Sequence, residues 1–294
     1  MKIALFAKPQ SGHSAEEVSK LLGALEASSL DYSVNSAFAA ILPQLCGITV
    51  NKSRQYDSLN DGSDIAMMIC YGGDGTFLEG VREVNGCGLP ILGINSGRLG
   101  FLANVPKEGI ENAFAGIAAG EYSIEERTML HVESRCLPEK ESMFAFNEFT
   151  IHRGAGAMIA VELFVDGEMV GRYWGDGVIL STPSGSTAYS LSAGGPVVAP
   201  GCECLLISPI APHNLTMRPV VIPDSSTVEL KVSSRGDTLY ASLDNKNYPT
   251  SGAPSFRVTK SGRSAKLVRL KNISFYDTLR NKLMWGLDRR DDQK

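Results

Sequence analysis

The sequence has few cysteines and no long apolar run. Its six cysteines are Cys46, Cys70, Cys87, Cys136, Cys202 and Cys204. Several stand in apolar surroundings typical of buried free thiols, so we expect no disulfide framework. Cys202 and Cys204 lie near His213 but lack the paired spacing of a zinc site, which favours ordinary core cysteines. No apolar run approaches the ~18 residues of a membrane span, and the first residues are typical of a strand rather than a signal peptide. We therefore expect a cytoplasmic protein with no membrane partner.

The chain also lacks an excess of positive charge. It carries 28 Lys and Arg residues against 32 Asp and Glu residues, a formal net charge of −4, and the basic residues are scattered along it. Proteins that bind nucleic acids normally need a concentrated basic surface, so no nucleic-acid partner is expected. The 294 residues are 43% hydrophobic and show no biased tract, which predicts a globular protein, and the length favours two domains.

Strand and helix patterns alternate in the first part of the chain. Apolar runs at residues 2–7, 65–70 and 89–94 are typical of buried strands. A capping-box pattern at Ser14–Glu17 predicts the start of a helix, and residues 77–84 predict another. This alternation indicates a parallel sheet covered by helices, whose ligands would bind at the carboxyl ends of the strands.

Strand patterns dominate after a helical stretch at residues 107–119. Val161, Leu163 and Val165 alternate with polar or mixed positions, and Asp166-Gly167 is a strong two-residue hairpin signal. We therefore predict an α/β domain over residues 1–122 and a mainly antiparallel β domain over residues 123–272.

The last segment, residues 273–294, returns to a helical pattern. Phe275, Leu279 and Leu283 form one apolar stripe at helical spacing. We expect this C-terminal helix to pack back onto the first domain.

The segment Gly72-Gly73-Asp74-Gly75-Thr76 lies between a predicted strand and a predicted helix. Backbone N–H groups in such a turn can face a phosphate, but the negative charge of Asp74 would repel one unless a cation or a proton-transfer role accompanies it. The segment fails the dinucleotide fingerprint because Leu78 replaces its last glycine, and no P-loop pattern is present. A tight turn with Asp74 or Thr76 as a helix cap remains an equal alternative.

A second segment, residues 175–196, is rich in glycine and hydroxyl side chains. Small residues let a ligand approach the backbone, and hydroxyl groups can bind ribose and phosphate oxygens, while Tyr189 offers a ring for stacking on a base. The alternative is a flexible surface linker. Between the two segments, Asn147 and Glu148 interrupt an apolar strand and could bind an adenine edge or ribose hydroxyls; the alternative is a strand edge that faces water.

Together these motifs resemble those of NAD kinases. The resemblance rests on Gly72 to Thr76, Asn147-Glu148, residues 175–196 and the C-terminal Phe275-Tyr276-Asp277-Thr278-Leu279-Arg280. The first motif is shared with diacylglycerol kinases, sphingosine kinases and phosphofructokinases, so by itself it indicates only phosphoryl transfer from a nucleotide. The longer second motif narrows the match to NAD kinases.

The resemblance implies an ATP-dependent NAD kinase with its active site between a nucleotide-binding domain at residues 1–122 and an NAD-binding domain at residues 123–272. The substrates would be NAD and ATP, the phosphoryl acceptor the 2′-hydroxyl of the adenosine ribose, and the product NADP. The cofactor would be a divalent metal, Mg or Mn, for which we assign no protein ligand. A homodimer or homotetramer is also implied.

The resemblance also implies roles for individual residues. Asp74 matches the proton acceptor for the ribose hydroxyl, although holding the metal is an alternative role for it. Gly72, Gly73 and Thr76 match the phosphate loop. The positions that match substrate contacts are Asp74, Gly75, Asn147, Glu148, Asp176, Thr187, Ala188, Tyr189, Ser190, Leu191, Ser192 and Ala211.

Four positions depart from the family pattern. They are Glu79 and Trp174, where relatives often carry basic residues, and Asn245 and Lys246, where relatives often carry Gly and Gln. The preferences for NAD over NADH, and for ATP over polyphosphate, stay open. A lipid kinase is a rival, but no basic amphipathic helix or lipid anchor is visible. A non-catalytic dinucleotide sensor is another, although binding alone would not require Asp74.

Overall fold

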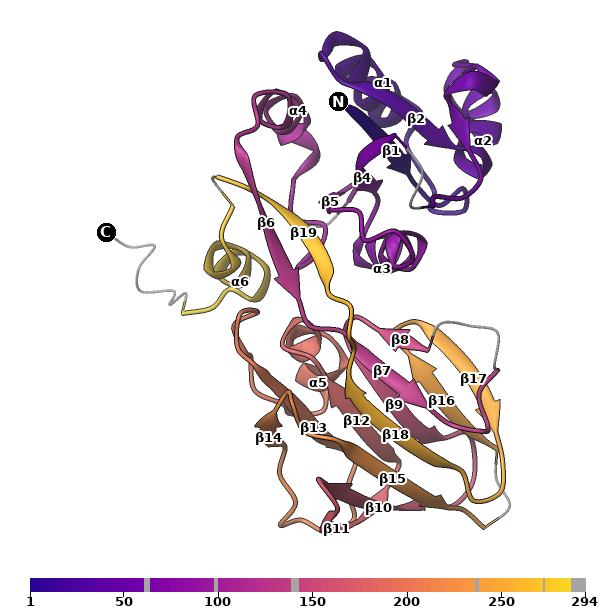
Figure 1. The fold of residues 1–294 in the computed structure, drawn as a ribbon, viewed down its shortest axis with the longest axis vertical. Coiled ribbons are helices and arrows are strands. Elements are labelled where there is room, and N and C mark those ends of the chain that lie inside the picture. Colours follow the sequence, from indigo (N-terminus) through magenta and orange to yellow (C-terminus); the bar gives the residue numbers. More distant parts are fainter. Residues whose placement is uncertain (61–63, 98–99, 139–142, 236–237, 272, 287–294) are drawn as a thin grey trace. The chain divides into compact units, whose positions relative to one another are not determined.

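The computed structural model describes residues 1–60, 64–97, 100–138, 143–235, 238–271 and 273–286. The chain forms two compact units (Figure 1). Unit 1 comprises Met1–Glu126 together with the segment that begins at Ala265, and unit 2 comprises Arg127–Ser264. The chain thus returns to unit 1 at residue 265, whereas the sequence pattern placed that return at residue 273. The difference is one strand, which pairs within the sheet of unit 1.

The sheet of unit 1 has seven strands in the order β3-β2-β1-β4-β5-β19-β6. The strands are β1 Lys2–Phe6, β2 Asp31–Asn35, β3 Gln55–Tyr56, β4 Ile65–Tyr71, β5 Ile91–Ile94, β6 Tyr122–Arg127 and β19 Ala265–Leu270. The pairs β1–β2, β1–β4, β2–β3, β4–β5 and β5–β19 are parallel. The predicted parallel sheet is therefore confirmed.

The helices of unit 1 are α1 Ala15–Ala27, α2 Ser36–Cys46, α3 Asp74–Val84, α4 Ile110–Ala118 and α6 Phe275–Leu283. The capping signal is confirmed, because the Ser14 hydroxyl accepts a hydrogen bond from the Glu17 N–H at the start of α1. Helix α2 was not predicted. It contains Pro43 and no charged residue, and it ends at Gly47, which adopts a positive φ of 74°.

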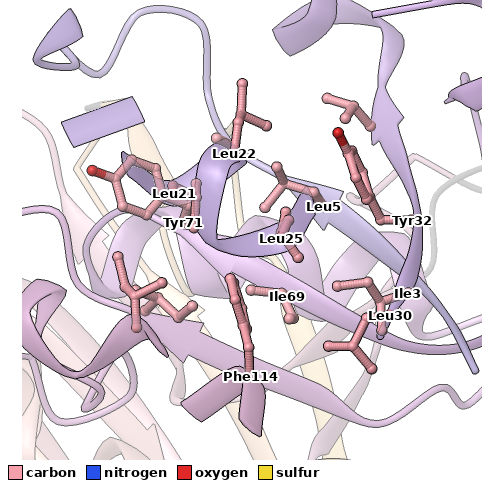
Figure 2. Packing of buried hydrophobic residues seen from close by; sticks show 14 of the residues in the cluster. Ile3, Leu5, Leu21, Leu22, Leu25, Leu30, Tyr32, Ile69, Tyr71 and Phe114 are labelled. Carbon is pink, nitrogen blue, oxygen red and sulfur yellow. The ribbon is translucent and has the colours of Figure 1, made fainter. Parts of the chain in front are cut away.

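Helices cover both faces of this sheet. Figure 2 shows Ile3, Leu5 and Ile69 of the strands packed with Leu25 of α1 and Phe114 of α4. On the opposite face α3 approaches β4 closely, since a Cβ atom at Gly80 would lie 2.2 Å from the Cys70 Sγ. The covered faces leave the carboxyl edge of the sheet, where β4 and β5 end in loops, as the place for a ligand.

The C-terminal helix α6 also belongs to unit 1. Its first turn is capped by the Ser274 hydroxyl, which accepts from the Asp277 N–H. The ring of Phe275 lies 6.5 Å from that of Phe101 in the loop after β5. The predicted return of this helix to the first domain is therefore confirmed for the described residues, and residues 287–294 lie outside them. Along the described stretches, none of the helices has both the length and the apolar character that crossing a membrane requires.

Unit 2 contains two six-stranded sheets. One has the order β11-β10-β15-β18-β7-β8, with β7 Leu130–Glu133, β8 Phe144–Ala145, β10 Ile159–Val165, β11 Glu168–Gly175, β15 Val228–Ser233 and β18 Ser255–Lys260. The other has the order β14-β13-β12-β9-β16-β17, with β9 Glu148–Arg153, β12 Gly177–Ser181, β13 Cys204–Ile210, β14 Val220–Pro223, β16 Leu239–Leu243 and β17 Lys246–Thr250. The paired strands are antiparallel, as predicted.

One hydrophobic core joins the two sheets of unit 2. Val161 and Leu230 of the first sheet are buried with Ile151, Leu180 and Ile207 of the second. The predicted hairpin between β10 and β11 is confirmed, with positive φ angles at both turn residues, Asp166 (51°) and Gly167 (84°). After β12 the chain continues into a short 3-10 turn, Ser184–Thr187, and the one-turn helix α5, Tyr189–Ser192.

Candidate active site

The glycine turn joins β4 to α3 at the carboxyl edge of the unit 1 sheet. Gly72 has a φ of 154°, and a Cβ atom there would lie 2.4 Å from the Thr76 Oγ1, so a side chain at this position is excluded. Gly73 is the N-cap of α3 and no side chain caps the helix. The alternative role of Asp74 or Thr76 as a helix cap is therefore wrong, and the free N-terminus of α3 remains suited to an anion.

The Asp74 carboxylate is held by the backbone of the loop after β5. Its Oδ2 accepts a hydrogen bond from the Phe101 N–H, and its Oδ1 accepts from the N–H groups of Leu102 and Ala103, each at 3.0 Å. Gly100 makes this approach possible, because a Cβ atom there would lie 1.9 Å from the Asp74 Oδ1. The turn and the loop are thus fastened to one another through a single carboxylate.

A lysine of α6 also contacts this carboxylate. The Lys282 Nζ lies 3.4 Å from the Asp74 Oδ2 and 4.9 Å from the centre of the Phe101 ring. The side chains of Asp74 and Lys282 are 31% and 33% exposed, so a ligand can reach both. Unit 1 therefore presents a carboxylate, an ammonium group and a helix N-terminus at one edge of its sheet, a set that can bind a phosphorylated hydroxyl compound and accept a proton from it.

Glu79, one of the departing positions, lies on α3 and forms an ion pair with Lys8. Lys8 follows β1 at the same edge of the sheet. The negative charge of Glu79 is therefore balanced by a cation from another element.

Asn147 and Glu148 lie where β9 begins, and β9 is an inner strand between β12 and β16. They are only 6% and 7% exposed, so the alternative of a strand edge facing water is wrong. The Asn147 Oδ1 and the Glu148 Oε2 are buried without a hydrogen-bond partner among the described residues. Buried polar atoms are normally paired, so these two oxygens indicate a place for ligand donors.

Asp244 holds the backbone of this segment. Its carboxylate accepts hydrogen bonds from the N–H groups of Phe146 (2.9 Å), Asn147 (2.7 Å) and Glu148 (3.2 Å). Burial, and to a smaller extent the nearby charge of Asp244, raise the pKa of Glu148 to about 8 against the opposing effect of hydrogen bonding from the Tyr189 backbone. Glu148 is therefore largely protonated at neutral pH and can donate a hydrogen bond as well as accept one.

The segment from Gly175 to Pro196 is not a flexible linker, because several of its hydroxyl side chains are buried. The Thr182 hydroxyl donates to the Phe146 carbonyl (2.7 Å) and accepts from the Gly185 N–H (3.2 Å). A Cβ atom at Gly185 would lie 2.2 Å from the Asn147 carbonyl oxygen. The segment thus lies directly on the Asn147-Glu148 strand, and glycine permits that contact.

The predicted binding loop from Thr187 to Ser192 is ordered by its own backbone and by one buried pair. Ser190 is buried, with its hydroxyl 3.0 Å from that of Ser208. The Thr187 hydroxyl donates to the Ser184 carbonyl. Tyr189 is 43% exposed, which leaves its ring accessible for stacking. Ala188, Leu191 and Ser192 complete this short turn and the helix α5.

Asp176 directly precedes β12 and Ala211 directly follows β13, at neighbouring ends of these two paired strands. The Asp176 N–H donates to the Ile210 carbonyl at 3.0 Å, and its carboxylate accepts from the Arg153 Nε at 2.6 Å. Ala211 adopts a positive φ of 40°, unusual for a residue with a side chain. A residue with a side chain keeps such a φ angle only where the surrounding structure constrains the backbone.

Two other departing positions make contacts of their own. The Arg172 guanidinium lies 4.9 Å from the centre of the Trp174 ring, and the Lys246 ammonium lies 5.7 Å from that of Tyr248. Asn245 lies between Asp244 and Lys246 in the turn that joins β16 to β17.

The structure places the turn residues Gly72 to Thr76 in unit 1 and the other predicted site residues in unit 2. Within unit 2 it brings Asn147 and Glu148 together with the 182–185 segment. Sequence reasoning missed the roles of Gly100, Lys282 and Asp244 beside these groups. The glycine at position 100 and the Asp244-Asn245 turn were visible signals, but nothing in the local sequence indicated which carboxylate or backbone they meet.

A metal site built from protein side chains is not apparent in the part of the chain that the structure describes. No group of three or more His, Cys, Asp or Glu residues there could hold an ion. The Asp74 carboxylate is already bonded by three N–H groups, so it does not supply a prepared ligand set either.

Comparison with known proteins agrees with this arrangement over both units. Residues 3–122 match the family model of the ATP-NAD kinase N-terminal domain, and residues 146–270 match that of the ATP-NAD kinase C-terminal domain. An NAD kinase of Flavobacterium psychrophilum is 39% identical over 295 residues, covering 99% of this chain and 100% of that protein. The chain belongs to the NAD kinase family.

A second relative and two solved structures are also similar to this chain over nearly its whole length. An NAD kinase of Cytophaga hutchinsonii is 37% identical over 99% of this chain and 100% of its own length. The crystal structure of an NAD kinase from Archaeoglobus fulgidus in complex with ATP has 26% identity and a TM-score of 0.73, covering 97% of this chain and 99% of that one. A yeast NADH kinase complexed with NADH shares the fold, with 24% identity and a TM-score of 0.83 over 98% of this chain and 89% of that one.

Proposed function

We propose that this NAD kinase family enzyme transfers the γ-phosphoryl group of ATP to the 2′-hydroxyl of the adenosine ribose of NAD, giving NADP. The observation that carries the proposal concerns Asp74, the first residue of α3. Its carboxylate accepts hydrogen bonds from the N–H groups of residues 101–103. A carboxylate fixed in this way can take the proton of the attacking hydroxyl, while Gly73 and Gly75, where a Cβ atom would meet nothing within 4 Å, and the N-terminus of α3 leave room for phosphate oxygens.

Unit 2 supplies the groups suited to the dinucleotide. The partnerless oxygens of Asn147 and Glu148 are placed to bind hydroxyl or amino groups of an adenosine moiety, and the exposed ring of Tyr189 can stack on a base. Asp176, Ala211 and the turn from Thr187 to Ser192 would complete the binding surface.

The divalent ion, Mg or Mn, would neutralise phosphate charge when it is bound. Since the described residues offer no cluster of protein ligands for an ion, we assign it to the nucleotide and derive no step through it. A homodimer or homotetramer remains a prediction from the family, and the cytoplasmic location remains a prediction from the sequence.

The proposal is tested by incubating the purified protein with ATP, Mg²⁺ and NAD and measuring NADP formation. We expect the wild-type protein to form NADP and Asp74→Asn to bind NAD but lose nearly all turnover, because an amide cannot accept the proton. A wild-type rate in the Asn variant would refute the base assignment. Parallel assays with NADH, polyphosphate and diacylglycerol identify the acceptor and donor, and a lipid product would contradict the proposal.

A further inference from the structure

We propose that Lys282 of α6 is a further active-site residue, which leaves the Asp74 carboxylate when ATP binds and then contacts the phosphoryl group that is transferred. The inference rests on the proposed function. It is carried by the contact between the Lys282 Nζ and the Asp74 Oδ2, 3.4 Å apart, and by the other bonds that this carboxylate makes.

The hydrogen-bonding capacity of the carboxylate is already filled. A carboxylate offers about four lone-pair sites, two on each oxygen. The Leu102 and Ala103 N–H groups occupy those of Oδ1, and the Phe101 N–H and the Lys282 ammonium occupy those of Oδ2. A ribose hydroxyl that is to give its proton to Asp74 must therefore displace one of these four donors.

Lys282 is the donor that can leave. The three N–H groups are part of the backbone and lie at 3.0 Å, whereas the ammonium lies at 3.4 Å on a flexible side chain that is one-third exposed. The Lys282 side chain also contacts the face of the Phe101 ring, and this contact leaves the ammonium N–H groups able to bond elsewhere. The backbone clamp can therefore stay intact while the lysine moves.

The charges nearby make Lys282 suited to a phosphate. Lys8 is paired with Glu79, and Arg280, on the same helix as Lys282, is paired with Asp277. Lys282 instead shares a carboxylate that three N–H groups already bind. An incoming triphosphate offers it a stronger anionic partner within reach, because the hydroxyl that attacks the γ-phosphorus must also lie against Asp74.

ATP, the ribose hydroxyl and Asp74 then account for every bond and proton that changes in the reaction. The ribose oxygen forms a bond to the γ-phosphorus, the bond from that phosphorus to the bridging oxygen breaks and ADP leaves with its electron pair, and the hydroxyl proton passes to the Asp74 oxygen that Lys282 has vacated. The ammonium meanwhile faces the phosphoryl oxygens, where negative charge must be stabilised in the transition state. Binding of ATP thus makes the base available to NAD.

The test compares Lys282→Met and Lys282→Arg with Lys271→Met as the matched control. Lys271 is an exposed lysine of unit 1 whose ion-pair partner is Glu121. We expect Lys282→Met to lower kcat at least tenfold and raise the KM for ATP, Lys282→Arg to keep most of the activity, and Lys271→Met to match the wild type. Methionine keeps the apolar stem against Phe101, so a role limited to packing on that ring predicts little change.

A calorimetric titration supplies a second readout. In the wild type, a non-hydrolysable ATP analogue should tighten NAD binding severalfold because it draws Lys282 away from Asp74. In Lys282→Met we expect the analogue to leave the affinity for NAD unchanged. If Lys282→Met folds poorly, the same titration is made with Lys282→Gln. An active wild type with equal kcat and equal linkage in the variant overturns this inference. A wild type that forms no NADP overturns the proposed function instead.

Discussion

Replacing Gly100 by alanine should remove the Asp74 carboxylate from its working position. The new Cβ would lie 1.9 Å from the Asp74 Oδ1 and 2.7 Å from its Cγ, so the loop and the carboxylate must separate by about 1.5 Å to reach ordinary contact. A misplacement of about 1 Å at a reacting group can cost about 100-fold in rate. We therefore expect kcat for NADP formation to fall by about 100-fold or more.

The same change should lower stability. It breaks or lengthens three N–H bonds to the carboxylate of Asp74, which is one-third exposed, so we count each at about 1 kcal/mol rather than the larger values of buried charged pairs. The sum, about 3 kcal/mol, corresponds to a decrease in Tm of about 6 °C or more for a unit of this size. Thermal unfolding followed by circular dichroism measures it.

Gly97→Ala is the matched control in the same loop. A Cβ atom at Gly97 would meet nothing within 4 Å, and its N–H bond to the Asn95 Oδ1 does not involve the side chain. We expect this variant to keep wild-type kcat and Tm. If Gly100→Ala retains at least half of the wild-type kcat, or if both variants lose activity equally, the argument that Gly100 positions Asp74 is refuted.

Three further predictions concern unit 2. Burial and Asp244 raise the pKa of Glu148 to about 8, so the contribution of its neutral form to stability is fully present below the unfolded pKa of 4.5 and is lost as pH rises to about 8. The decrease in Tm between pH 5 and 8 should therefore be shallower in Glu148→Gln than in the wild type. An equal decrease in both proteins contradicts the raised pKa of Glu148. Asp244→Ala leaves three backbone N–H groups without their acceptor, so the KM for NAD should rise at least tenfold in steady-state assays, and an unaltered KM would show that Asp244 does not position this strand. Gly185→Ala places a Cβ atom 2.2 Å from the Asn147 carbonyl oxygen, so NAD binding measured by calorimetry should weaken at least tenfold. If the variant binds NAD with wild-type affinity, the contact between Gly185 and Asn147 does not position the binding site.

Much of the fold could be predicted from local patterns. The strands β1 and β4, the capped start of α1, the hairpin at Asp166-Gly167 and the stripe of α6 all follow from periodicity and turn chemistry, which depend on neighbouring residues alone. Helix α2 was missed because Pro43 and its nearly uniform apolar character obscure a helical period. Strand β19 was assigned to the β-rich part because its partner β5 lies more than 170 residues earlier, and strand pattern does not indicate the partner.

The sequence by itself determined the chemistry that this protein can perform. Each motif is a continuous stretch of sequence, so its composition could be recognised without the structure: the glycine turn with Asp74, the Asn147-Glu148 pair and the 175–196 segment. The tertiary structure alone decided what each of these groups touches. The N–H groups of 101–103 and the ammonium of Lys282 reach Asp74 from 27 to 208 positions away, because a carboxylate selects its donors by proximity in space and not along the chain.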